Sequence, residues 1–218
     1  MIKRYFLFFL VPLIFVTACS KKSVQLPLIE APGLTDIQNH SSIWIFMETR
    51  EGDTLAAMNK NNKILNTHWI FNIDRRLNME QVVPFLVQMQ ENRNKDSMHK
   101  KEGMENYFSY ADPSSEKIRL FPFTKTTYDT SFNEPDSPDG MAPLYLTRSS
   151  IHFKERNFDY DSIGSITKIL DSCRDDDVMK VRLMLDGKAT FQNYLRTKVE
   201  LFSNGVPCDP VEYIHSVK

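Results

Sequence analysis

Val178-Met-Lys-Val-Arg-Leu-Met-Leu185 carries apolar side chains at alternate positions, and this period of two predicts a strand with one apolar face. Asp186-Gly187 follows as a turn, and Thr190 belongs to the residue types that begin helices. The side chains after it that recur at helical spacing are Phe191, Tyr194, Leu195, Val199 and Phe202. Asn204-Gly205 supplies the residue types of a left-handed helix C-terminus. The sequence therefore predicts a strand–turn–helix unit over residues 178–205.

An earlier segment repeats this pattern at a distance of 112 positions. Trp69-Ile-Phe-Asn-Ile-Asp74 corresponds in kind to residues 181–186, and Asn78 corresponds to Thr190. In both segments a strand ends in an Asp that can accept hydrogen bonds from turn amides, and an amphipathic helix follows. Pro84 inside the earlier helix pattern predicts a kink there or a later regular start. The two segments are either a structural duplication or a chance recurrence of a common unit.

Further strands and helices complete a mixed pattern. Short runs rich in β-forming residues predict strands over residues 42–48, 67–73, 117–123, 143–147 and 150–153, and a helix is expected to end near Cys173. These elements together predict an α+β fold, with small mixed sheets and helices packed on one face of each. The expected organisation is a first α+β unit over 41–123, a loop or linker over 124–142, and a second α+β unit over 143–218.

The first 18 residues have the order of a secretory signal. Lys3 and Arg4 precede an apolar run from Tyr5 to Val16, and small residues then lead to Cys19. The run is shorter than the ~20 residues that span a bilayer, which argues against a plain transmembrane anchor. A cleaved, unlipidated signal is the other alternative, but it does not need a cysteine directly after Ala18. Val16-Thr-Ala-Cys19 resembles the lipobox of bacterial lipoproteins, and the resemblance implies that Cys19 is lipidated and becomes the mature N-terminus.

The lipoprotein resemblance also implies where the protein lies. Acyl chains on Cys19 would hold it to a membrane, because each buried methylene contributes about 0.8 kcal/mol. By analogy with enterobacterial sorting, Ser20 rather than Asp after the cysteine implies the outer membrane, and the lack of an acidic cluster there favours the face toward the periplasm. Residues 19–40 read as a flexible tether. The alternative is that Leu26, Leu28 and Ile29 dock on the body as an extra strand.

Composition limits the other partners. Loss of Lys3 and Arg4 with the signal reduces 27 basic residues to 25, against 28 acidic residues, and gives a formal charge of −3. Because there is no basic excess, we expect no nucleic-acid partner. Cys173 and Cys208 remain after lipidation, and an exported protein permits a disulfide between them. The alternative is a pair of unbonded, partly buried thiols.

Catalytic motifs are missing from the sequence. The five histidines form no HxxxH or HExxH pair, and there is no GxSxG, GxGxxG or P-loop pattern. Asp175-Asp-Asp177 lacks the ligand spacing of a calcium loop. We therefore expect no metal or cofactor, and His68 and His152 are interpreted as structural residues of strands. The sequence favours a membrane-tethered, non-enzymatic protein-interaction module with exposed strand edges. The alternative is an envelope hydrolase with a dispersed acid/base site.

The second unit also resembles a known family. A hydrophobic strand, a short acidic turn and a helix with an aromatic residue near its start are typical of the periplasmic domain of the ExbD/TolR biopolymer-transport family. The corresponding positions here are Val181, Leu183, Leu185, Asp186, Phe191 and Tyr194. The resemblance covers residues 143–205 and more faintly 43–93, and it implies an envelope protein partner and a role accessory to envelope transport. Members of that family carry a transmembrane helix with an ionisable Asp for proton-driven motor function. This chain has a lipobox instead, so we expect Asp74 and Asp186 to form turns.

Overall fold

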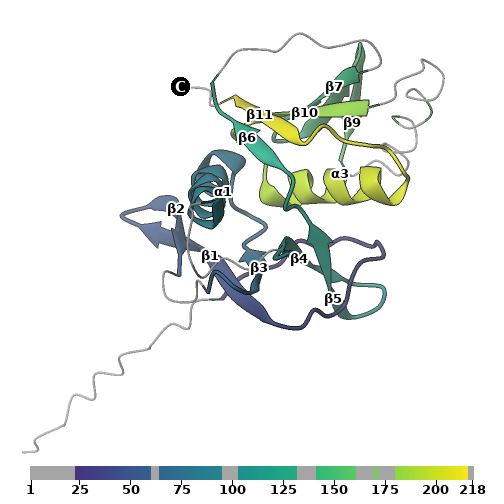
Figure 1. Ribbon diagram of the computed structural model, residues 1–218. Helices are drawn as coiled ribbons and strands as arrows, with labels where there is room; N and C mark the ends of the chain where they lie inside the picture. The colour runs from purple at the N-terminus through teal and green to yellow at the C-terminus, as the bar shows by residue number, and fades with distance from the viewer. Residues whose placement is uncertain are drawn as a thin grey trace, which may run out of the picture.

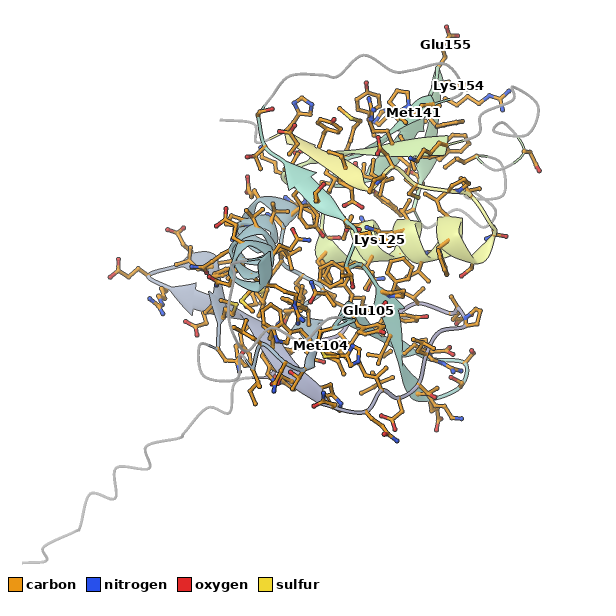
Figure 2. All side chains as sticks on the ribbon, viewed as in Figure 1. Met104, Glu105, Lys125, Met141, Lys154 and Glu155 are labelled. Atoms are coloured by element: carbon orange, nitrogen blue, oxygen red, sulfur yellow. The ribbon has the colours of Figure 1, made fainter. Side chains whose placement is uncertain are left out.

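The computed structural model describes residues 23–59, 64–94, 103–131, 141–160 and 180–215, together with Ile169 and Asp171. In these residues, two mixed β-sheets lie on either side of a layer formed by two helices, α1 (Met79–Asn94) and α3 (Phe191–Ser203) (Figure 1). Side chains fill the space between the sheets (Figure 2), and one cluster of buried apolar residues draws on both sheets and both helices. The expected α+β class is therefore confirmed.

The first sheet has the strand order β2-β1-β3-β4-β5. Its strands are β1 (His40–Arg50), β2 (Asp53–Met58), β3 (His68–Ile73), β4 (Asn106–Asp112) and β5 (Lys117–Pro122). β1, β3 and β4 run parallel to one another, and β2 and β5 pair antiparallel at the two edges. Strand β2 is absent from the sequence expectation, because Asp53-Thr-Leu-Ala-Ala-Met58 contains few β-forming residues.

The second sheet has the order β6-β11-β10-β7-β8-β9. Its strands are β6 (Thr127–Asp129), β7 (Met141–Leu146), β8 (Ser150–Phe153), β9 (Arg156–Asp159), β10 (Lys180–Asp186) and β11 (Val211–His215). Lys125 lies where the chain crosses from the first sheet to the second (Figure 2), and β6 follows at once, parallel to β11. Residues 124–142 are therefore not simply a linker, since β6 is a strand of the second sheet.

Both sheets contain the same arrangement of strands and helix. An antiparallel hairpin (β1–β2 or β7–β8) is followed by a strand that pairs in parallel with the hairpin's first strand (β3 or β10). A helix then leads to another parallel strand on the far side (β4 or β11). The pairing register also repeats, because Trp69 N donates to Glu105 O and Val181 N donates to Pro207 O, both at 2.9 Å.

The two strand–turn–helix segments bond directly to each other. Met79 N donates to Ala189 O (2.9 Å), and Phe191 N donates to Leu77 O (2.8 Å). A second pair joins Glu80 N to Gly187 O (2.9 Å) and Gln192 N to Arg75 O (3.1 Å). In each pair of bonds the two donor residues are 112 positions apart, and so are the two acceptor residues. This reciprocity is the contact pattern of a two-fold axis, so the segments are related by an approximate two-fold rotation.

The ends of α3 follow the sequence expectation. Thr190 Oγ1 accepts a hydrogen bond from Asn193 N at 3.2 Å, so Thr190 is the helix N-cap. At the other end, Gly205 adopts φ +74°, Gly205 N donates to Phe202 O, and Val206 N donates to Leu201 O. These two bonds form a Schellman motif, which requires a residue that tolerates positive φ. Pro84 lies inside α1 without ending it. The helix expected before Cys173 falls outside the described residues, apart from Ile169 and Asp171.

The N-terminal segment lies on the body. Ile29 N donates to Ala111 O (3.0 Å), Ala111 N donates to Pro27 O (2.8 Å), and Leu120 N donates to Leu34 O (2.8 Å). Ile29 is 2% exposed. Gly33 permits the close crossing, because a Cβ there would lie 2.4 Å from the Tyr110 hydroxyl. Residues 25–34 therefore dock on the body rather than forming a free tether. They do so through two isolated bridges, Leu28–Ala111 and Leu34–Leu120, and not as the extra strand of the alternative expectation.

Candidate functional site

The histidines expected to be structural make ordinary hydrogen bonds. His68 in β3 accepts from Glu105 N through Nδ1 at 3.1 Å, and His152 Nε2 in β8 lies 3.1 Å from Ser150 Oγ. The structural interpretation of both residues stays a prediction. His99 lies outside the described residues. Within the described ranges, no three His, Cys, Asp or Glu side chains gather closely enough to hold a metal ion.

Asp74 and Asp186 are turn residues, as expected. Asp74 Oδ1 accepts from Arg76 N at 3.1 Å, and Asp186 Oδ1 accepts from Lys188 N at 2.8 Å, which are equivalent bonds in the two units. Asp74 is fully buried and also forms a 2.7 Å ion pair with Arg76. Burial alone raises the pKa of Asp74, but hydrogen bonds from the Arg76 side chain and from the Arg76 and Gln25 amides outweigh it, and the net pKa is lowered. These bonds place both carboxylates in the turns that follow β3 and β10.

The predicted lipidation and disulfide sites stay predictions. Cys19 and Cys173 lie outside the described residues. Cys208 is half-buried and pairs with Val181 beside β10. It lines a largely apolar cavity of about 410 Å³ together with Phe202, which is 64% exposed. Across the ranges described, no helix has the length and apolar character needed to cross a bilayer.

A buried ionic network connects α3 to the second sheet. Lys198 of α3 is paired with Glu212 of β11, and its Nζ also donates to Thr126 Oγ1 (2.7 Å) and Tyr194 OH (3.3 Å). Tyr128 OH lies 3.2 Å from Tyr194 OH. Lys198 is 6% exposed and Glu212 is 0% exposed. Burial, with the charge of Glu212, raises the pKa of both tyrosines well above the usual range. This network fixes β11 and the crossing segment to α3, and Glu212 Oε2 is buried without a partner among the described residues.

Arg93, in the last turn of α1, is a second buried cation with fewer partners. Its guanidinium carbon lies 3.7 Å from the centroid of the Trp69 ring, a cation–π geometry. Nη2 donates to Thr67 O at 3.2 Å. Nε and Nη1 are buried and have no hydrogen-bond partner. Burial lowers the pKa of Arg93 to about 10. Arg93 therefore retains its charge at neutral pH without an ion-pair partner among the described residues.

A cavity of about 240 Å³, partly open to solvent, lies between α1 and the segment that crosses between the sheets. Arg93 and Asn106 line it, and Asn106 Oδ1 is also buried without a partner. Asn106 is the cross-strand neighbour of Trp69, so its side chain lies on the same face of the first sheet. The remaining lining residues are Val87, Gln90, Glu91, Thr124, Thr126, Thr127 and Tyr128.

Each of three cavities lined by described residues contains at most one carboxyl group. The cavity at Arg93 contains one carboxylate, Glu91, and the cavity at Cys208 contains one, Asp209, which is paired with Arg182 at 2.9 Å. A third cavity of about 510 Å³, around Leu34 and Phe202, is lined by no ionisable group. None of these three cavities pairs two carboxyls or a carboxyl with a histidine among its lining residues.

A strand edge that no described strand covers is the other candidate surface. Residues 40–45 of β1 pair with β3, whereas residues 45–50 pair with β2, so the β1–β2 hairpin extends past β3. β2 is the edge strand of the sheet. Asn59 N donates to Trp44 O, so these two residues form a hydrogen-bonded pair. Because such pairs alternate along antiparallel strands, Ala57 and Leu55 also bond to β1, whereas the N–H and C=O groups of Ala56 point away from β1. Leu55 is 44% exposed. At one end of this edge Gln81 Nε2 donates to Thr54 O.

Sequence reasoning named Trp69, Tyr194 and Cys208 for other reasons, but it did not single out the charged and polar residues of these features, Lys198, Arg93 and Asn106. Lys198 gave one signal, since it interrupts the apolar face formed by Tyr194, Leu195 and Val199. Arg93 and Asn106 gave none, because a charged residue at a helix end and a polar residue at a strand start are ordinary. Their juxtaposition arises only from the packing of α1 on β3 and β4.

Comparisons of the chain with protein-family models, with curated proteins and with solved structures find no match. The lipobox and the resemblance to the ExbD/TolR family therefore rest on the residues quoted above. The functional argument rests on the geometry of the chain itself.

Proposed function

We propose that this protein is a lipid-anchored protein of the bacterial envelope whose body faces the periplasm and acts by binding a partner protein. The observation that carries the proposal is the β1–β2 hairpin, which extends beyond its sheet and presents the backbone of an edge strand. An extended segment of an envelope protein would pair with that edge and continue the sheet. The absence of paired acid/base groups in the three cavities weakens the hydrolase alternative.

The edge of β2 suits strand addition for two reasons. Its outward backbone groups at Ala56 have no neighbouring strand among the described residues. Its exposed side chains include Leu55, which gives an incoming strand an apolar contact. Edge strands that must stay single usually carry Lys, Pro or a bulge, and Asp53–Met58 has none of these. The edge is therefore open to a partner.

The relation between the two units belongs to the same proposal. We interpret them as a duplicated ββ–β–α–β unit in which each sheet carries helices on one face. The reciprocal hydrogen bonds at 112 positions support this interpretation. From the resemblance to the ExbD/TolR family we also propose a role accessory to envelope transport.

The anchor is tested separately from the partner surface. Cys19→Ala should leave the protein uncleaved or should release it from membranes, since residues 1–18 and the lipid are its expected membrane attachments. Mass spectrometry of the native protein should show cleavage before Cys19 and acylation of its thiol. Full membrane partitioning of a processed Cys19→Ala protein would contradict the anchor without affecting the binding surface.

The partner surface is tested with a proline. Ala56→Pro removes an outward N–H of β2 and leaves the bonds to β1 intact, so it should block strand addition with little effect on folding. Affinity capture of the full chain from envelopes should recover a defined partner, and recovery should fall about tenfold for Ala56→Pro. Ala57→Thr, on the same strand, is the control and should keep the partner. Equal recovery by both variants, or sedimentation that shows only self-association, would overturn the proposal.

A further inference from the structure

Two residues that line the cavity beside α1 carry buried polar atoms of opposite kind that no described residue satisfies. Arg93 contributes two donors, Nε and Nη1, and Asn106 contributes an acceptor, Oδ1. An unsatisfied buried polar group costs about 1–3 kcal/mol, and native structures hold few of them, each of which calls for an explanation. A single bound molecule that has an acceptor next to a donor would satisfy both residues at once.

The charge of the cavity determines the kind of acceptor. Arg93 forms no salt bridge with a described carboxylate, so no acidic group of the described residues compensates its buried positive charge. Glu91 lines the same cavity with an exposed side chain. One guanidinium balances one negative charge, and Glu91 repels a second. A carboxylate therefore fits this cavity better than a phosphate dianion does.

We propose that this cavity binds the carboxylate of an α-amino acid or of a peptide's C-terminal residue. Arg93 binds the carboxylate, and Asn106 Oδ1 accepts a hydrogen bond from the nitrogen attached to the ligand's α-carbon. If that nitrogen is a free ammonium, Glu91 at the cavity lining supplies the opposite charge. The volume of about 240 Å³ lies below the roughly 300–1,000 Å³ of pockets for drug-sized ligands. The cavity therefore accommodates one residue, and a longer chain would leave through the open side.

Calorimetric titration of the purified full chain tests this proposal with four probes. The probes are L-alanine, N-acetyl-L-alanine, L-alaninamide and inorganic phosphate, each up to about 10 mM, where a millimolar Kd gives a measurable signal. Alanine or N-acetyl-alanine should bind, and alaninamide, which lacks the carboxylate, should not. Binding of alanine alone identifies a free amino acid as the ligand class. Binding of N-acetyl-alanine at least as tightly identifies a chain end.

Two variants locate the binding at Arg93. Arg93→Met keeps an apolar side chain of similar length and should weaken carboxylate binding at least about tenfold. Its thermal midpoint should equal or exceed that of the wild type, because the substitution removes a buried charge that has no ion-pair partner among the described residues. Arg148→Met, at an exposed position in the β7–β8 turn, should bind like the wild type. The proposal is overturned if neither carboxylate probe binds, if alaninamide or phosphate binds as tightly, or if Arg93→Met leaves the affinity unchanged. The wild-type probe series decides the matter even if Arg93→Met does not fold. None of these outcomes depends on the edge of β2.

Discussion

Lys198 in α3 and Arg93 in α1 are both buried cations, but only Lys198 is neutralised. Lys198 pairs with Glu212 and donates to two hydroxyl groups, whereas Arg93 has one carbonyl acceptor, the face of Trp69 and two nitrogens without partners. Both charges are held by helices of the same repeated arrangement. A buried charge with a complete set of partners stabilises one conformation, and a buried charge without them leaves an interaction for a ligand.

The two cations do not occupy equivalent positions. At a displacement of 112 residues, Lys198 corresponds to Leu86 and Arg93 corresponds to Gly205. Leu86 is fully buried, and Gly205 ends α3 at positive φ. The two units are therefore equivalent in their backbone hydrogen bonds, but not in the positions of their charged side chains. The helices share a scaffold, while their chemistry is specific to each unit.

Removal of the counter-charge in α3 should produce the largest effect. Glu212→Gln leaves Lys198 buried without an anion, so the free energy of unfolding should fall by about 3–5 kcal/mol. Urea denaturation followed by far-UV circular dichroism measures the change. The double variant Lys198→Met with Glu212→Leu should recover most of the loss, because it removes both charges. A loss below about 1 kcal/mol for Glu212→Gln would mean that this buried ion pair contributes no more than a surface ion pair does. The contrast between Lys198 and Arg93 would then not hold.

Local patterns were sufficient for part of the fold. Alternation identified β10, and helical spacing with a capping residue identified α3 and its ends, because each of these signals lies within the element itself or directly beside it. β2, β6, β9 and β11 have weak local signals, and their strand conformation depends on partners far away in the chain. β6, for example, has three residues and forms beside β11, more than eighty positions later. The docking of residues 25–34 depends in the same way on Ala111 and Leu120.

The candidate site shows the same limit more strongly. Trp69, Arg93 and Asn106 come from β3, α1 and β4, and only the packing of α1 on the sheet brings them together. Sequence alone assigned Asp74 and Asp186 correctly, since an Asp at a strand end bonds to its own turn. A cation buried at a helix end, such as Arg93, is not visible in the sequence, because charge at a helix position normally indicates a solvated face.

The two turn aspartates should differ in their effect on stability and in their acid response. Asp74→Asn breaks the buried ion pair to Arg76 and should cost about 1–3 kcal/mol at neutral pH. Asp186→Asn, at a half-exposed position, should stay within about 0.5 kcal/mol. Because the pKa of Asp74 is lowered in the folded state, its contribution is fully present above the ordinary value of 3.8 and is lost as pH falls through the lower folded value. Thermal midpoints between pH 7 and pH 2 should therefore converge for Asp74→Asn and the wild type in acid. Parallel curves would show that Asp74 is not linked to acid unfolding.

The helix starts offer the smallest and most direct comparison, because each unit uses a different half of a capping box. In α3 the side chain of Thr190 accepts from Asn193 N, whereas in α1 the side chain of Gln81 accepts from Asn78 N at 3.2 Å. Thr190→Ala should lower the free energy of unfolding by about 1 kcal/mol. Gln81→Ala should cost about half as much, since its bonds lie nearer solvent. Chemical denaturation of both variants and of Thr190→Ser, which keeps the hydroxyl and should stay near the wild type, measures the difference. If Gln81→Ala were the more destabilising change, the bond from Gln81 to Thr54 O in β2 would contribute more stability than the bond at the helix start. The β1–β2 hairpin would then depend on its contact with α1, although it extends past β3.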